Sequence, residues 1–129
     1  MDYIDKLAIE IKKLKLDVAV YYNNIIIQHP KPQKINDIVL SKEKDKNLIR
    51  FYNEELEKDK WNLRILFDKK NIYIDSFSSP NDEIGVMRTL NKIIEWKADR
   101  ERDLQTLEAI KRYAEATLTF EHLFVGGES

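Results

Sequence analysis

The stretch that decides the fold is Asn62-Leu63-Arg64-Ile65-Leu66-Phe67-Asp68-Lys69-Lys70-Asn71-Ile72-Tyr73-Ile74-Asp75. Apolar and polar residues alternate on both sides of Lys69-Lys70, with the period of two that half-buried β-strands show. A tight turn at these lysines fixes one register for an antiparallel hairpin. The residue pairs in that register are Phe67 with Ile72, Ile65 with Ile74, and Arg64 with Asp75.

This register gives the hairpin one apolar face and one polar face. The polar face carries Arg64 opposite Asp75, a cross-strand pair of opposite charges. We therefore expect Arg64 and Asp75 to face solvent. The side chains that we expect to be buried are Leu63, Ile65, Phe67, Ile72 and Ile74.

A similar hairpin precedes it in the sequence. Val18–Tyr22 and Ile25–Gln28 flank Asn23-Asn24, and asparagine tolerates the positive φ that two-residue turns require. This turn pairs Tyr22 with Ile25 and Val20 with Ile27. Two prolines follow in His29-Pro30-Lys31-Pro32 and end the strand, because proline donates no hydrogen bond to a sheet.

Helical spacing appears on both sides of these hairpins. Residues 2–15 predict an N-terminal amphipathic helix with Asp2 as its cap, and its apolar face is Ile4, Leu7, Ala8, Ile11 and Leu14. A long helical region begins at Ser79-Pro80-Asn81-Asp82, with Ser79 as N-cap and Pro80 in the first turn. It ends at Gly126-Gly127, where glycine favours termination.

The segment between the hairpins has two interpretations. Residues 41–58 form a helix if Leu48, Ile49, Tyr52 and Leu56 share one face. Alternatively, residues 37–52 extend the sheet, since Ile38-Val39-Leu40 and the stretch from Leu48 to Tyr52 favour strands. We favour the helix. The expected organisation is one α+β domain over residues 1–125 and a short tail at 126–129.

The apolar face of the long helical region changes direction along the chain. Its first stripe consists of Ile84, Met87, Leu90, Ile93 and Ile94, and its second contains Leu104 and lies about 140° further round. The region is either continuous or broken near Asp99–Asp103, and we favour continuity. A continuous helix cannot turn both stripes to one sheet, so the second predicts a partner-binding surface: Trp96, Leu107, Ile110, Ala114 and Leu118.

Composition restricts the classes of function. Lys and Arg number 22 against 23 Asp and Glu, for a net charge of −1, whereas nucleic-acid binders usually carry a basic excess. There is no cysteine, which removes disulfides, thiolate zinc sites and cysteine nucleophiles. The N-terminus does not resemble a signal peptide and no apolar run approaches a membrane span, so we expect a cytoplasmic protein.

The sequence contains no pattern typical of a catalytic, cofactor or metal site. Its only two histidines, His29 and His122, are far apart in the sequence, and His29 before Pro30 favours a surface or edge position. Ser79 is better explained as a helix cap than as a nucleophile. We therefore expect no enzyme activity, no cofactor and no metal.

These observations favour a non-enzymatic protein-binding module, with homodimerisation through the C-terminal helix included. The chain is rich in Ile, Lys and Asn, whose codons are A/T-rich. That composition favours an accessory or inhibitory protein of a phage or mobile element, for example one acting on a host defence complex. One alternative is a nucleic-acid binder with a local basic and aromatic surface. The element order is also similar to the small chaperones of bacterial type III secretion, which implies a chaperone-like role.

Overall fold

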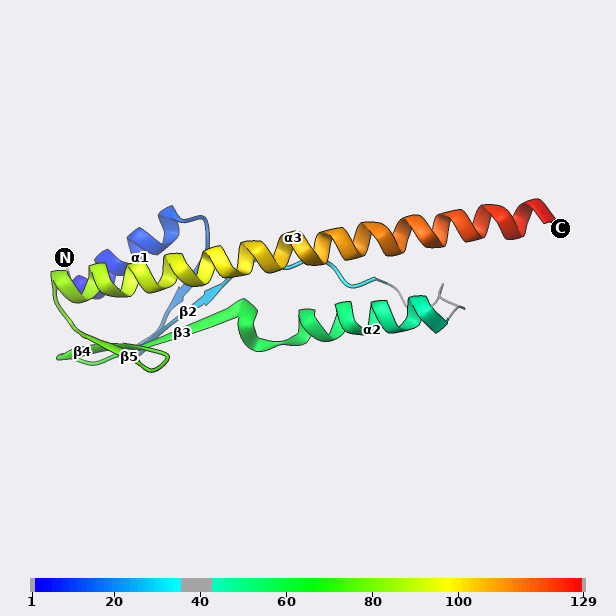
Figure 1. The fold of residues 1–129 in the computed structure, drawn as a ribbon. Coiled ribbons are helices and arrows are strands. Elements are labelled where there is room, and N and C mark those ends of the chain that lie inside the picture. The colour runs from blue at the N-terminus through cyan, green and yellow to red at the C-terminus, as the bar shows by residue number, and fades with distance from the viewer. Residues whose placement is uncertain (1, 36–42, 129) are drawn as a thin grey trace. The chain divides into compact units, whose positions relative to one another are not determined.

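The computed structural model describes the backbone of residues 2–35 and 43–128, and the side chains of residues 2–35 and 46–116. The predicted α+β class is confirmed, with an N-terminal helix, an antiparallel sheet and a long C-terminal helix (Figure 1). The elements in chain order are α1 (Tyr3–Lys13), β1 (Asp17–Val20), β2 (Asn24–Gln28), α2 (Glu43–Glu57), η2 (Asp59–Trp61), β3 (Asn62–Phe67), β4 (Asn71–Ile74), β5 (Phe77–Pro80) and α3 (Glu83–Glu128).

Contacts within the chain separate two compact units. Unit 1 contains Met1–Pro30 and Asp59–Glu101, and unit 2 contains Lys31–Lys58 and Arg102–Ser129. Unit 1 therefore holds the sheet, α1 and the first part of α3, while unit 2 holds α2 and the rest of α3. Each unit buries apolar side chains of its own.

The sheet of unit 1 is an antiparallel meander with the strand order β1-β2-β3-β4-β5. Helices α1 and α3 lie against the same face of this sheet (Figure 1). The apolar face of each strand meets them there, because side chains alternate across a strand. The buried core of unit 1 is Ile4, Leu7, Ile11, Leu16, Ile25, Ile27, Ile65, Ile72, Ile74, Val86 and Ile93.

The predicted register of the β3–β4 hairpin is confirmed. Ile65 pairs with Ile74 and Phe67 pairs with Ile72. Ile65, Ile72 and Ile74 are buried, and Leu63 and Phe67 are half-buried against the same core. Arg64 and Asp75 are both exposed, as expected. Asp75, however, follows the end of β4 and has a φ of 54°, so it belongs to the β4–β5 turn and not to the ladder.

The register predicted for the first hairpin is wrong by two residues. Val20 pairs with Ile25 and Val18 with Ile27, and the Tyr21 amide donates to the Asn24 carbonyl at 2.7 Å. The turn is therefore Tyr22-Asn23. A slip of two residues keeps every side chain on its original face. The apolar pattern is consequently the same in both registers and does not choose between them.

The start of α3 also differs from the prediction. Phe77–Pro80 forms β5, which pairs with β4, and the helix begins at Glu83. Asp82 is the capping residue, because its carboxylate accepts the Gly85 amide hydrogen at 2.9 Å. Ser79 is buried in β5 and does not cap the helix. Pro80 is tolerated there because β5 is an edge strand.

Gly85 lets the first turn of α3 lie directly on the end of β5. A Cβ atom at this position would lie 1.5 Å from the Pro80 carbonyl oxygen, well inside van der Waals contact. Only glycine fits such an approach of backbone to backbone.

Helix α3 is continuous for 46 residues, through Asp99–Asp103 and through Gly126-Gly127. Continuity at Asp99–Asp103 confirms the favoured interpretation, whereas the predicted end at Gly126 is wrong; each glycine costs a helix only about 1 kcal/mol.

In unit 2, the predicted helix between the hairpins is present as α2, so the strand alternative is wrong for residues 43–52. Ile38-Val39-Leu40 lies outside the described residues. Ile49, Tyr52 and Leu56 are buried on one face of α2, and Leu107 and Ala114 are buried on α3. Burial, followed by the carboxylates of Glu108 and Glu115, raises the pKa of Tyr52 to about 12. α2 therefore faces α3 within this unit.

Candidate functional site

Unit 1 leaves the second face of its sheet uncovered. Side chains on this face belong to alternate positions of the strands, opposite to the buried isoleucines. In the ladder Leu66 lies opposite Tyr73, and Ile26 lies opposite Arg64. We call this surface the open face and define it by Tyr21, Ile26, Arg64, Leu66 and Tyr73. Among the residues that the structure describes, no α-helix of unit 1 packs on it.

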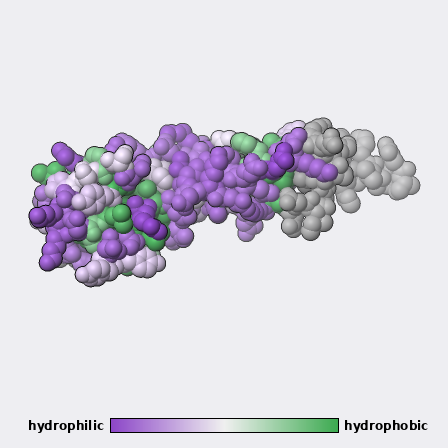
Figure 2. Space-filling model, turned by 90° about the horizontal axis from the view of Figure 1, so that it is seen from below, coloured by the Kyte–Doolittle hydropathy of each residue, from purple (hydrophilic) through white to green (hydrophobic). Residues whose placement is uncertain are grey.

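The open face exposes three large side chains with apolar or aromatic groups, among polar neighbours such as Asn24 and Ser78. Tyr21 is 53% exposed, Leu66 47% and Tyr73 38%. Figure 2 shows hydrophobic side chains between hydrophilic ones over the part of the molecule that contains the sheet. Neighbouring apolar side chains on a face of this kind mark interaction sites more often than isolated exposed ones do.

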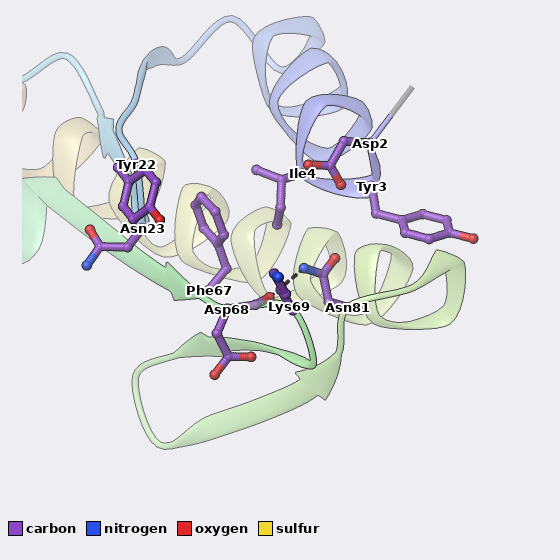
Figure 3. A pocket seen from close by; sticks show the side chains of 9 residues that line it. All are labelled: Asp2, Tyr3, Ile4, Tyr22, Asn23, Phe67, Asp68, Lys69 and Asn81. Carbon is purple, nitrogen blue, oxygen red and sulfur yellow. Dashed lines mark hydrogen bonds between the residues drawn. The ribbon is translucent and has the colours of Figure 1, made fainter.

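A pocket of about 600 Å³ lies beside the β3–β4 turn, at one end of the sheet. Three segments contribute its walls: the start of α1, the β1–β2 turn and the β3–β4 turn (Figure 3). Asn81 joins them by donating its side-chain amide hydrogen to the Asp68 carbonyl oxygen at 2.7 Å. The full lining is Asp2, Tyr3, Ile4, Tyr22, Asn23, Phe67, Asp68, Lys69 and Asn81.

One of the two carboxylates that line this pocket, that of Asp68, organises the β3–β4 turn. Asp68 Oδ1 accepts the amide hydrogens of Lys70 and Asn71 at 2.8 and 2.7 Å, and Oδ2 accepts the Tyr73 hydroxyl at 3.3 Å. The backbone hydrogen bonds from Asn71 and Lys70 hold the pKa of Asp68 below its usual value. An ionised carboxylate whose oxygens already accept hydrogen bonds is a poor general acid or base, so Asp68 is suited to holding the turn and not to proton transfer.

A second hollow separates α1 from the outer side of α3. Its volume is about 330 Å³ and its lining includes Tyr3, Ile9 and Met87. The exposed fraction of Ile9 is 41%, that of Ile84 is 59% and that of Met87 is 62%. The first stripe of α3 was expected to cover the sheet, and this expectation is wrong at Ile84, Met87 and Ile94, which face outward. The buried positions are Val86, Thr89 and Ile93.

Trp96, the first predicted partner-binding residue, belongs to a cluster inside unit 1. Its indole Nε1 donates to the Lys60 carbonyl at 3.1 Å. The ring of His29 lies 6.1 Å from that of Trp96 and 5.8 Å from that of Trp61. His29 Nδ1 donates to the Pro30 carbonyl at 2.7 Å. His29 is buried, so its predicted surface position is wrong; the adjacent proline indicated the end of a strand but not what packs there.

The other predicted partner-binding residues lie in unit 2. Leu107 and Ala114 are only 3% and 1% exposed, and Ile110 is half-buried. Leu118 lies outside the described side chains. The premise that this stripe is bare in a single chain is therefore wrong at Leu107 and Ala114. The structure does not bring Trp96 together with them, because it belongs to unit 1.

Sequence reasoning missed the open face, although one signal for it was present. Leu66 stands at a polar-face position of β3 and interrupts the alternation between Ile65 and Phe67. An apolar residue at such a position is typical of a sheet whose second face packs against another protein element or a partner. The tyrosines gave no separate signal, since aromatic residues are common in ordinary strands.

In the part of the chain that the structure describes, no three His, Asp or Glu side chains lie close enough together to hold a metal ion. No helix among the same residues combines the length and the apolar composition that crossing a bilayer requires. Comparisons with protein-family models, with curated proteins and with solved structures find no match to this chain.

Proposed function

We propose that this chain is a non-enzymatic protein-binding module that contacts its partner through the open face. The observation that carries the proposal is that Tyr21, Leu66 and Tyr73 are exposed on one uncovered sheet face, where Leu66 lies opposite Tyr73 and Asn24 separates Leu66 from Tyr21. Tyrosine is enriched at protein interfaces because it joins a large apolar ring to a hydroxyl. Arg64 beside them adds a charge at the edge of the apolar area.

The proposed role is that of an accessory or inhibitory protein. We expect the protein to come from a phage or mobile element and to act on a host defence complex. The codons of Ile, Lys and Asn are A/T-rich, so the composition supports an A/T-rich genome of that kind. Inhibition by association needs only a complementary surface, so it requires no catalytic group. The partner we expect is a protein with an apolar patch and an acidic group facing Arg64.

The test is retention of a partner by the immobilised full chain, comparing wild type with Leu66→Glu. Leu66 projects from the open face, so its replacement leaves the core intact, and circular dichroism verifies the fold. Phe51→Glu is the matched control, because Phe51 is 50% exposed on α2, in the other unit. We expect a protein that wild type and the control retain and Leu66→Glu loses. Equal retention by all three proteins contradicts the proposal.

A nucleic acid is the second candidate partner, because Tyr21, Tyr73 and Arg64 share one sheet face. Aromatic rings on a sheet stack on the bases of single strands, and arginine contacts the phosphates. Raising the salt concentration separates the two candidates. Binding to phosphates falls steeply with salt because counterions are released, whereas an apolar protein interface changes little. A steep decline for a single-stranded oligonucleotide favours this alternative.

A further inference from the structure

The outward side of α3 in unit 1 carries a regular apolar seam. Its positions repeat at intervals of three and four residues, which is the a/d pattern of a coiled coil. We define the seam as Ile84, Met87, Asn91, Ile94 and Ala98. The first four are exposed and Ala98 is half-buried. Val86, Thr89 and Ile93, on the opposite side of the helix, are buried in unit 1.

Within the part of the chain that the structure describes, no helix fills this seam. α1 is the nearest helix on that side, and the hollow of about 330 Å³ lies between α1 and Met87. Apolar residues at a and d positions become buried when a second helix inserts its own side chains between them. The seam therefore has the form of one half of a helix pair.

We propose that the seam pairs with the same seam of a second copy of this chain, with the two α3 helices parallel. Asn91 favours this partner, because it stands at an a position between apolar neighbours. In a parallel pair in register, Asn91 meets Asn91 of the other copy and the two amides satisfy each other. A different helix would need a side chain that hydrogen-bonds with an amide at the same place.

At the start of the seam, charge complementarity supports the parallel direction. Glu83 stands at position g and Arg88 at the following position e, and both are exposed. Parallel pairing places Glu83 of each copy against Arg88 of the other, which gives two pairs of opposite charges. Neither residue forms an ion pair with the described part of its own chain.

An antiparallel arrangement of the same two helix segments is disfavoured, both by the position of Asn91 and by the charges. In it, a positions meet d positions, so Asn91 lies against Met87 and its amide lacks a partner. Residues at e meet each other, which brings the two Arg88 side chains together. Like charges and an unpaired buried amide both destabilise such a pair.

The pair we propose is short. The next seam positions after Ala98 are Glu101 and Gln105, so apolar contact extends over about two heptads, fewer than an isolated coiled coil needs. Tyr3 and Ile9 of α1, exposed beside the seam, enlarge the contact. The dimer should therefore be weak and depend on concentration. It uses a different surface from the open face and does not rest on the function proposed above.

The test is the molar mass of the full chain by light scattering over about a hundredfold range of concentration. We expect a monomer–dimer equilibrium that Met87→Glu abolishes and the matched control Phe51→Glu leaves unchanged. Arg88→Glu should weaken the dimer about three- to tenfold, and the double variant Glu83→Arg/Arg88→Glu should restore it. A chain that stays monomeric throughout, or a dimer that Met87→Glu does not affect, overturns the proposal.

A single introduced cysteine tests the direction, since the chain has no other. In the parallel pair two copies of position 87 face each other at a d position, close enough for a disulfide. Met87→Cys should therefore form a covalent dimer on mild oxidation, while the control Phe51→Cys should not. A covalent dimer formed equally by both variants, or by neither, overturns the parallel arrangement.

Discussion

The two units of this chain are stabilised in different ways. Unit 1 buries eleven clustered apolar residues between its sheet and two helices. Among its described side chains unit 2 buries fewer apolar residues. It adds polar contacts to α2: Lys31 Nζ donates to the Leu56 carbonyl at 3.0 Å, and the Tyr52 hydroxyl donates to the Gln33 carbonyl at 2.7 Å. Lys34 also forms an ion pair with Glu57. A small core depends more on each individual contact, so single substitutions should affect the two units differently.

The largest effect is expected in the core of unit 1. Ile65→Ala removes a completely buried side chain at the centre of the sheet, with packed neighbours on every side. The free energy of unfolding should fall by about 3–4 kcal/mol. Urea denaturation of the full chain measures it, with Arg64→Ala as the exposed neighbour on the same strand. A loss below about 1 kcal/mol would mean that this core is loosely packed.

Leu107→Ala is the corresponding change in unit 2. We expect a loss of about 2–3 kcal/mol in the free energy of unfolding, because Leu107 is a buried side chain, 3% exposed. Hydrogen exchange should accelerate in α2 and in α3 beyond Arg102, while the strands keep their protection. Equal acceleration in the strands would show that the two units unfold together.

Tyr52 gives unit 2 a dependence on alkaline pH. Its pKa rises from 10.0 to about 12 in the folded chain, so the folded state keeps the hydroxyl proton that the unfolded state releases. The resulting stability is fully present below pH 10 and is lost as the pH rises through about 12. The loss should be roughly 2 kcal/mol. In Tyr52→Phe the free energy of unfolding should decline less between these pH values than in wild type.

The smallest effect should appear at the start of α3. Asp82→Ala removes the hydrogen bond to the Gly85 amide and should cost about 1 kcal/mol, whereas Asp82→Asn should retain most of it. Ser79 is the matched comparison, because the sequence favoured it as the cap. Its buried hydroxyl has no hydrogen-bond partner among the residues that the structure describes, so Ser79→Ala should be neutral or slightly stabilising. Thermal denaturation compares the three variants, and a larger loss for Ser79→Ala would reverse the assignment.

Local patterns predicted most of unit 1. The β3–β4 hairpin followed from its alternation, because slipping Ile65 by one residue would expose it. The first hairpin was misregistered because a slip of two residues exposes nothing new. Thr89 explains the error in α3: it is polar and fully buried, so the buried face of the helix does not coincide with its most apolar stripe. An apolar seam on the outside has the same periodicity as one on the inside.

Unit 2 was less predictable, and for a different reason. The burial of Leu107 and Ala114 depends on α2, which comes from a distant part of the chain and whose helical state was itself ambiguous. Lys31 and Tyr52 donate hydrogen bonds to backbone carbonyls. Every residue has such a carbonyl, so the acceptor cannot be predicted from the residue types. The sequence therefore identified the second stripe of α3 as apolar. It did not identify α2 as the element that packs in the same unit.

Gly85 has a consequence for the whole of α3. A helix held at one point of its circumference cannot rotate about its own axis, and the contact between Gly85 and the Pro80 carbonyl provides that point. The rotational phase of α3 in unit 1 is therefore set by this backbone contact in addition to side-chain packing. It turns Val86 and Thr89 inward and leaves Ile84 and Met87 outside. A single methyl group at position 85 would shift this phase and, with it, the choice of which residues of α3 are buried in unit 1.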